Sequence, residues 1–352
     1  TGTAAAVAGG FTSVCCMPNT KPVNDESPVT QLIKMKSGEA GRATVYPIGA
    51  ITKGSVGREL TDFQALKEAG CVAVSDDGRP VMDDRLMRQA MQRASDLDLP
   101  VIDHCEELLL SGCGCINEGP VSRALGMRGI PKGSEFRMIA RDIRLAEATG
   151  AHLHVAHLST AAGVDMVRQA KAKGLSVTAE VCPHHFTLTD EAVREQGVNA
   201  KMNPPLRSEQ DRAALLKGLA DGTIDAIATD HAPHAEYEKQ WGMDRAPFGI
   251  VGLETALALT LRLVETGVLS LEQAVRCLTS KPAGLLGLPG GTLMPGASAD
   301  IAVVDRACEW VVDPEQFYSK GRNTPFGGWR LHGRVMMTFV GGQIRYRWPD
   351  AA

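Results

Sequence analysis

Residues 152–181 read HLHVAHLSTAAGVDMVRQAKAKGLSVTAEV, and this stretch contains the repeating unit of the fold. It begins with a short apolar run, His152–Ala156, which ends in the polar cluster His157-Leu158-Ser159. An amphipathic helical stretch, Ala161–Lys173, comes next, and a second apolar run, Ser176–Val181, follows it. A strand, a helix and another strand in this order form a parallel βαβ unit, so the stretch predicts an α/β fold with a parallel sheet.

The same alternation extends along most of the chain. Seven short apolar runs have the character of strands: Thr12–Met17, Thr44–Ile51, Cys71–Ser75, Pro100–Asp103, His152–Ala156, Ser176–Val181 and Ala226–Thr229. The best helical stretches lie between or after them: Asp84–Leu97, Glu135–Thr149, Ala161–Lys173, Ser208–Ala220, Leu253–Thr266 and Leu271–Thr279. Polar clusters follow most of the strands at their C-terminal ends, which is typical of a (β/α)8 TIM-type barrel. An open sheet usually carries a glycine-rich phosphate loop, and the sequence contains none.

The front of the chain predicts an incomplete barrel. Residue 1 is Thr rather than Met, and seven strands are found where a barrel needs eight. The first twenty residues have neither the basic segment of a signal peptide nor the apolar length of a membrane span. We therefore expect that strand 1 of the barrel is missing from this chain and that the natural N-terminus lies upstream of Thr1.

The character of the sequence changes at about Leu288. Segments rich in glycine and proline lead into three β-runs, Asp300–Val304, Arg334–Val340 and Gln343–Trp348. We therefore expect two domains. Residues 1–287 form a metal-dependent hydrolase barrel that is incomplete at its N-terminus, and residues 288–352 form the C-terminal part of a small composite β-domain.

The composition is that of a folded protein without a polyanionic partner. Among 352 residues, 37 Lys and Arg face 41 Asp and Glu, which gives a formal net charge of -4, and 44% of the residues are hydrophobic. These values exclude a disordered chain and a nucleic-acid binder that works by bulk charge. Nine scattered cysteines, an odd number, predict free thiols in a reducing compartment. We expect a cytoplasmic protein that binds neither nucleic acid nor membrane.

Histidine is the most informative residue type. His104, His157 and Asp230 each follow a different β-run directly, and Asp77 does the same on a fourth. Two imidazoles and two carboxylates at one end of a barrel suit a divalent metal, and zinc fits them best. Taken alone, any one histidine is more often a core residue than a ligand, and Asp76-Asp77-Gly78 is an ordinary turn. The combination of the four residues favours a metal site.

Other polar residues leave alternatives open. His152 and His154 alternate along one strand, and their early position favours the barrel wall over metal ligation. For His184-His185 we favour a packing or supporting role. The segment Asn203-Pro204-Pro205-Leu206-Arg207 is either a rigid loop that binds an anionic, amide-rich substrate or an ordinary surface loop. His332 lies far along the chain, and we expect a structural role for it.

Seven motifs together resemble the type I dihydroorotases, which belong to the amidohydrolase superfamily of metal-dependent barrels. The motifs are Met17-Pro18-Asn19-Thr20, Ser75-Asp76-Asp77-Gly78, Asp103-His104-Cys105-Glu106, His154-Val155-Ala156-His157-Leu158-Ser159, Asn203-Pro204-Pro205-Leu206-Arg207, Thr229-Asp230-His231-Ala232-Pro233-His234 and Ala246-Pro247-Phe248-Gly249-Ile250-Val251-Gly252. The resemblance extends from about residue 1 to residue 347, with the motifs in the expected order.

The resemblance implies a cyclic amide hydrolase that converts dihydroorotate reversibly to N-carbamoyl-aspartate in pyrimidine synthesis, with one or two zinc ions. It implies that Asp77 bridges two metals, or is the acidic ligand where one is bound, and we choose Asp77 over Asp76 by its separation from His104. His104 and His157 would hold the second metal. Asp230 would ligate the first metal and act as the general base.

The resemblance also implies the substrate contacts. Asn19 and His234 would contact the substrate carboxylate. Asn203 and the backbone around Pro247, Phe248 and Gly249 would hold the pyrimidine ring. Arg207 would lie on a mobile loop, and its role is carried over only weakly.

Two alternatives belong to the same superfamily. Hydantoinases, dihydropyrimidinases and allantoinases use a carboxylated lysine on the fourth strand, whereas Val72–Asp77 contains no lysine. A non-catalytic subunit that supports aspartate transcarbamoylase would have no reason to keep Asp77, His104, His157 and Asp230. We expect a homo-oligomer, with aspartate transcarbamoylase as a possible partner.

The sequence departs from the family at its front. The family supplies two ligands of the first metal and a substrate-binding arginine from a His-x-His-Leu-Arg segment on strand 1, and this chain does not contain that segment. We therefore expect the chain as given to have little dihydroorotase activity, and turnover at a normal rate would contradict this.

Overall fold

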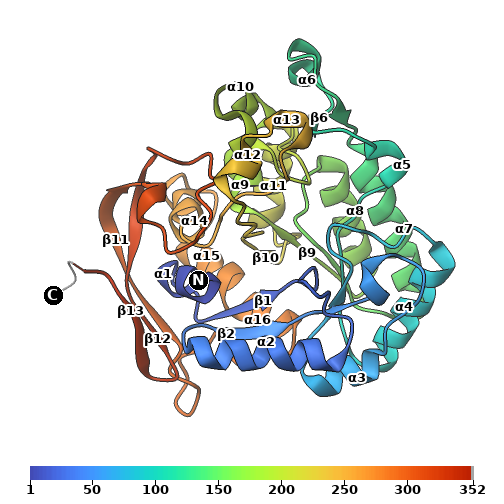
Figure 1. Ribbon diagram of the computed structural model, residues 1–352, viewed down its shortest axis with the longest axis horizontal. Helices are drawn as coiled ribbons and strands as arrows, with labels where there is room; N and C mark the ends of the chain where they lie inside the picture. Colours follow the sequence, from blue (N-terminus) through green and yellow to red (C-terminus); the bar gives the residue numbers. More distant parts are fainter. Residues whose placement is uncertain (350–352) are drawn as a thin grey trace.

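Short parallel strands form the barrel wall in the computed structural model, which describes residues 1–349 (Figure 1). The strands are β1 (Ser13–Cys16), β2 (Thr44–Pro47), β3 (Gly49–Ala50), β4 (Val74–Ser75), β5 (Val101–Asp103), β8 (Leu153–Val155), β9 (Val177–Val181) and β10 (Ala226–Ile227). β1 pairs with β2, and the order β3-β4-β5-β8-β9-β10 follows the chain, with every pair parallel. Since only Ile48 separates β2 from β3, these are the seven predicted strand positions.

Helices cover the outside of the wall. They are α2 (Ser27–Ala40), α3 (Phe63–Ala69), α4 (Asp84–Asp96), α7 (Gly133–Thr149), α8 (Ala161–Ala172), α11 (Glu209–Ala220), α14 (Ala256–Glu265), α15 (Leu271–Leu278) and α16 (Ser280–Leu285). The amphipathic period explains their placement, because α4 buries Met87, Ala90, Met91 and Ala94 on one face. The helices predicted from the sequence are confirmed to within a few residues at their ends.

Shorter elements lie in the connections between the main strands and helices. They are α5 (Leu108–Ser111), β6 (Ile116–Asn117), α6 (Pro120–Ala124), β7 (Gly129–Ile130), α9 (Pro183–Thr187), α10 (Val193–Gln196), α12 (Glu236–Lys239) and α13 (Gly242–Arg245), with 3-10 turns at Lys53–Ser55, Asp190–Ala192, Gly197–Ala200 and Pro314–Gln316. No helix among residues 1–349 has the length and apolar character that crossing a membrane requires.

The two faces of β9 show how the wall is built. Val177, Ala179 and Val181 are buried, whereas Thr178 and Glu180 alternate with them and are only half-buried. The Thr178 hydroxyl lies 2.8 Å from both His152 Nε2 and His154 Nδ1. Glu180 Oε2 lies 3.2 Å from His154 Nε2. Both histidines therefore belong to the barrel wall, as their early position in the strand predicts.

A three-stranded antiparallel sheet packs beside the barrel. It consists of β11 (Ile301–Val311), β12 (Arg330–Val340) and β13 (Gln343–Arg347) in this order, and it contacts α1 (Gly2–Ala8) and α14. The buried Thr338 hydroxyl on β12 donates a hydrogen bond to the Val7 carbonyl at 2.7 Å. The chain therefore ties its first helix to its last sheet.

The segment between β11 and β12 returns to the barrel. Val312, Phe317 and Phe326 are buried within the same apolar cluster as the barrel strands. The predicted division into residues 1–287 and 288–352 therefore follows the change in secondary structure, whereas part of the second range packs with the barrel. The division stays a prediction. Residues 350–352 of the second range lie outside the described residues.

We expect Thr338→Val to lower the free energy of unfolding by about 1–3 kcal/mol, because the buried Val7 carbonyl would lose its partner. Thr266→Val is the control, since the Thr266 hydroxyl donates to Arg262 at the exposed end of α14, where substitutions change stability by less than about 0.5 kcal/mol. Urea denaturation measures both. Equal losses in the two variants would show that the buried hydrogen bond between β12 and α1 stabilises the fold no more than an exposed one does.

Candidate active site

Three side chains from three neighbouring strands converge at the C-terminal ends of the strands. His104 follows β5 directly, and Asp77 and His157 lie two residues beyond β4 and β8. His104 Nδ1 and His157 Nε2 are 2.9 Å apart, and Asp77 Oδ1 lies 3.7 Å and 3.6 Å from them. Because parallel strands in register end at the same edge, these residues meet although 80 positions of sequence separate the outermost two.

The donor set fits a divalent metal. Two buried imidazole nitrogens and a carboxylate oxygen lie within 4.8 Å of one another. This combination of borderline nitrogen and hard oxygen ligands is the one that zinc takes in catalytic sites, where the remaining position stays open. The structure therefore brings together three of the four metal ligands that the sequence predicts.

The fourth predicted ligand, Asp230, lies beside this group. It follows β10 by three residues and is half-buried. Burial and the nearby Asp77 carboxylate raise the pKa of Asp230 to about 6, while His157 and His104 oppose that shift. A carboxyl group with a pKa near neutrality has the property that a general base needs.

The backbone is strained at two of these residues. His157 has a φ of +32° and Asp230 a φ of +44°, and only Ser55 and Asp98 share a positive φ among the other non-glycine residues from 1 to 349. Such left-handed conformations cost of the order of 1–3 kcal/mol each and occur mainly at functional sites. Two of these four left-handed residues, His157 and Asp230, are therefore residues that the sequence motifs indicate.

The group holds charge even without a cation. Burial opposes the imidazolium of His157, but the hydrogen-bonding Asp77 carboxylate and the charge of Asp230 raise the pKa of His157 to about 9. The two histidines in turn lower the pKa of Asp77 against the effect of its burial. The site is therefore built for a positive charge between the carboxylates.

Glu106 is a residue of the site to which the sequence analysis gave no role. Its Oε2 lies 3.0 Å from His104 Nε2 and accepts a hydrogen bond of 2.9 Å from Asn203 Nδ2. Burial opposes its ionisation, but the hydrogen bond and the charge of His104 lower the pKa of Glu106 to about 2. A carboxylate on the far nitrogen of a ligating histidine fixes its tautomer and ring orientation. The sequence could have indicated this role, because Glu106 lies two residues after His104, a predicted ligand.

The neighbouring aspartates have different surroundings. Asp76 is buried and accepts hydrogen bonds from Ile51 N at 2.9 Å, from Thr52 N at 3.1 Å and from the Thr52 hydroxyl. Asp77 faces the histidines and accepts a hydrogen bond of 3.1 Å from Asn19 Nδ2. The sequence analysis chose Asp77 over Asp76 as the metal ligand by its spacing from His104. The geometry supports the same choice.

The remaining predicted substrate residues form a second group. His234 Nε2 lies 2.7 Å from the Phe248 carbonyl, and its backbone N donates to Asn323 Oδ1 at 3.1 Å. Gly249 has a φ of +115°, and a Cβ there would lie 2.5 Å from the Cβ of Ala232, so this turn needs glycine. Asn203 is not part of this second group, because its side chain contacts Glu106 and His104.

Two buried lysines hold the loop that contains Pro247, Phe248 and Gly249. Lys239 Nζ donates to the Pro247 and Gly249 carbonyls at 3.0 and 3.1 Å. Lys201 Nζ donates to the Ala246 carbonyl at 2.6 Å and lies 4.4 Å from the centre of the Phe248 ring. The sequence analysis missed both, because nothing local distinguishes them from surface lysines.

Two further donor clusters occur among the described residues. Asp103, Cys105 and Asp142 lie together, but Arg141 already provides a positive charge there through Asp142, at 2.8 Å. Cys182, His184 and His185 form a fully buried group in which burial raises the pKa of the thiol well above its usual range. The first cluster therefore already has a cation beside it, and the thiol of the second is held in its protonated form.

We expect Asp77→Asn to weaken zinc binding by at least about tenfold, because it removes a charged ligand atom. Asp76→Asn is the matched variant, one residue away. It should leave zinc affinity unchanged and lower the free energy of unfolding by about 1–3 kcal/mol, since the amide nitrogen cannot accept the Thr52 hydrogen bond. Calorimetric zinc titration and urea denaturation separate the two effects, and a reversed pattern would make Asp76 the ligand.

The chain matches two protein-family models. Residues 1–162 match the model described as dihydro-orotase-like, and residues 134–346 match the amidohydrolase family. A dihydroorotase from Syntrophotalea carbinolica is 55% identical over 349 residues, which cover 99% of the chain and 82% of that relative. A dihydroorotase from Pelotomaculum thermopropionicum is 57% identical over 345 residues, which cover 98% of the chain and 81% of that relative.

Solved structures share the fold. The L-hydantoinase (dihydropyrimidinase) from Arthrobacter aurescens has a TM-score of 0.87 at 26% identity, with 97% of this chain and 78% of that chain covered. The dihydropyrimidinase from Brevibacillus agri has a TM-score of 0.82 at 23% identity, with 98% and 79% covered. These likenesses confirm the TIM-type barrel predicted from the sequence. The identity to the dihydroorotases extends over nearly the whole chain, and the chain therefore belongs to the dihydroorotase family of the amidohydrolases.

Proposed function

We propose that the protein is a zinc-dependent dihydroorotase, which hydrolyses dihydroorotate reversibly to N-carbamoyl-aspartate in pyrimidine synthesis. The observation that carries this proposal is the convergence of His104, His157 and Asp77 beside Asp230, in a chain that belongs to the dihydroorotase family. The family implies a metal cofactor, and the nitrogen and oxygen donors favour zinc among the divalent metals.

One or two zinc ions would be held by residues of the barrel mouth. Asp77 would lie between the two positions, His104 and His157 would hold one metal, and Asp230 would ligate the other. When bound, the metal supplies Lewis-acid chemistry, because it polarises an amide carbonyl and lowers the pKa of water towards about 7.

Asp230 would move the proton. As the water oxygen bonds to the ring carbonyl carbon, Asp230 accepts the water proton, and it then donates this proton to the ring nitrogen as the C–N bond breaks. One carboxylate would serve both steps by facing both the attacking water and the ring nitrogen. In the metal-free site, burial and the Asp77 carboxylate raise the pKa of Asp230 to about 6, and a bound cation would lower it and keep the carboxylate ready to accept a proton.

The other predicted residues would hold the substrate. We assign the substrate carboxylate to Asn19 and His234, and the pyrimidine ring to Asn203 and the backbone of Pro247, Phe248 and Gly249. The contacts of Asn19 with Asp77 and of Asn203 with Glu106 support this, since each amide lies next to a metal-site residue. Groups fixed in this way make the attack nearly intramolecular.

The alternatives have less support. A hydantoinase or allantoinase would need a lysine at the end of β4, where this chain has Asp77. A non-catalytic subunit would gain nothing from the strained, charged group of His157 and Asp230. A cytoplasmic location, self-association and an aspartate transcarbamoylase partner remain parts of the proposal.

We expect Asp230→Asn to lower kcat by a factor of about 100 to 10,000 in the natural protein, because the amide cannot accept a proton. The metal held by His104 and His157 should remain. The measurement is the loss of dihydroorotate absorbance together with metal content. Undiminished turnover in this variant would exclude Asp230 as the base.

We expect chelation to abolish dihydroorotate hydrolysis by the natural protein and added zinc to restore it, because a metal held by His104, His157 and Asp77 would supply the activation of water. Activity that survives complete removal of metal, verified by elemental analysis, would contradict a metal-dependent reaction.

A further inference from the structure

The turn that follows β8 is held by one buried carboxylate. Glu135, in the first turn of α7, accepts hydrogen bonds from the backbone N–H groups of Ser159 at 3.1 Å and of Thr160 at 2.8 Å. It also accepts the hydroxyl of Thr160 at 2.5 Å and that of Ser159. Four donors on two consecutive residues thus meet a single side chain. Ser159 lies two positions beyond His157, so this contact fixes the chain next to a proposed metal ligand.

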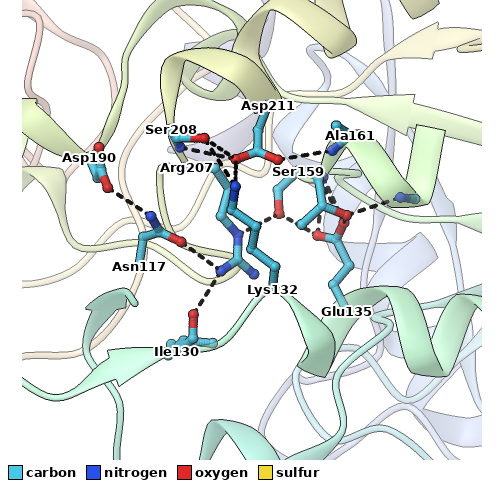
Figure 2. A network of polar contacts seen from close by, with 12 residues as sticks. Asn117, Ile130, Lys132, Glu135, Ser159, Ala161, Asp190, Arg207, Ser208 and Asp211 are labelled. Carbon is cyan, nitrogen blue, oxygen red and sulfur yellow. Dashed lines mark hydrogen bonds and ion pairs between the residues drawn. The ribbon is translucent and has the colours of Figure 1, made fainter. Parts of the chain in front are cut away.

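Arg207 joins the same turn from a distant part of the chain. Figure 2 shows its guanidinium between Asn117, Ile130 and Ser159. Arg207 Nε donates to the Ser159 hydroxyl at 3.1 Å, and Nη1 donates to Asn117 Oδ1 at 3.1 Å and to the Ile130 carbonyl at 2.9 Å. The Ser159 hydroxyl therefore lies between a buried arginine and a buried glutamate.

The segment that carries Arg207 begins at Asn203. Asn203 donates to Glu106, which contacts His104, while Arg207 contacts Ser159 next to His157. The short segment from Asn203 to Arg207 therefore connects Glu106, which contacts His104, with Ser159, which lies near His157. The resemblance places Arg207 on a mobile loop, but here its side chain is only 4% exposed.

The network is buried. Glu135 is 3% exposed, and Ser159 and Asn117 are buried as well. Removing one member of a buried hydrogen-bond network leaves its partners unsatisfied, so the remaining groups must rearrange. A neighbouring carboxylate, Asp211, accepts a hydrogen bond of 3.1 Å from the Ala161 backbone at the start of α8 and pairs with Lys132 (Figure 2). The chain beyond His157 is thus held at several consecutive positions.

We propose that Arg207, Ser159 and Glu135 are positioning residues of the metal centre, which clamp the turn after β8 so that His157 Nε2 stays opposed to His104 Nδ1. The inference rests on the proposed function in assigning a metal to these histidines and the substrate ring to Asn203. The clamp keeps His157 in its left-handed conformation, which an unrestrained histidine leaves. Through Asn203 it also couples ring binding to metal binding, and such coupling is reciprocal.

The test is zinc affinity, measured by calorimetric titration of the metal-free natural protein and its variants. Arg207→Met removes the guanidinium at similar length, and Ser159→Ala removes only the hydroxyl. Arg207→Lys is the conservative variant, which keeps the charge but not the three-donor fork. Far-UV circular dichroism and the unfolding midpoint show whether each variant is folded.

Lys171→Met is the matched control. Lys171 lies on α8 near its far end and pairs with Asp225 at 2.6 Å, and Asp225 also accepts a backbone hydrogen bond from Ala179 at 3.0 Å. The variant therefore removes a cationic side chain together with its hydrogen bonds, as Arg207→Met does, without touching the turn after His157.

We expect the zinc dissociation constant to rise about 10- to 100-fold in Arg207→Met, the range found for residues that orient metal ligands, and less in Ser159→Ala. Arg207→Lys should recover part of the loss. Lys171→Met should have the zinc dissociation constant of the unmodified protein, even if its unfolding midpoint falls as far as that of Arg207→Met. In turnover assays, Arg207→Met should lower kcat and raise KM for dihydroorotate, since it releases both His157 and Asn203.

Unchanged zinc affinity in folded Ser159→Ala and Arg207→Lys would overturn the inference. So would a loss in Lys171→Met that equals the loss in Arg207→Met, because the effect would then be general destabilisation. If Arg207→Met does not fold, the Ser159→Ala and Arg207→Lys titrations decide. Failure of the proposed function is separate: a protein that binds zinc with the expected variant pattern but leaves dihydroorotate intact would refute the reaction and keep the clamp.

Discussion

The contact between His104 and His157 is the interaction on which the rest of the site depends. Two imidazole nitrogens 2.9 Å apart beside the Asp77 carboxylate require three strands to end at matching heights. The parallel register provides this, because Asp103 pairs with Val155 across β5 and β8. Side chains alternate along a strand, so a shift of one residue in the register between two strands would move a ligand away from the other ligands at the barrel mouth.

The structure keeps this contact with buried charge. Glu106 faces His104, Asp77 faces both histidines, and Glu135 holds the turn beyond His157. Each carboxylate accepts several hydrogen bonds or lies next to a histidine, and an isolated buried charge would be very costly. The polar groups are therefore mutually dependent, and removing one changes the position of the others.

The barrel strands and the loops that follow them have different roles. Short strands with apolar outer faces give a rigid frame, and the loops at their C-terminal ends carry the polar residues. Loops usually adapt, but here buried lysines and Asn323 tie the Pro247–Gly249 region to the frame. The segment between β11 and β12 contributes to the same rim through Asn323.

The local pattern of the sequence determined the strands, the helices and the residues that follow the strands. Apolar periodicity is a short-range property, so β5 and β8 and the positions of His104 and His157 followed from it. Motif resemblance added roles, including those of Asp230 and Asn203. Only the tertiary structure distinguished the surroundings of Asp77 from those of Asp76, since both follow the same strand.

The partners of buried polar groups were likewise decided by the tertiary structure. Arg207 is buried against Ser159 rather than exposed on a loop, and Lys201 and Lys239 bind backbone carbonyls. The physical reason is the range of each interaction. Periodicity reports which face of an element is buried, whereas a hydrogen bond between residues 48 positions apart depends on the path of the whole chain between them.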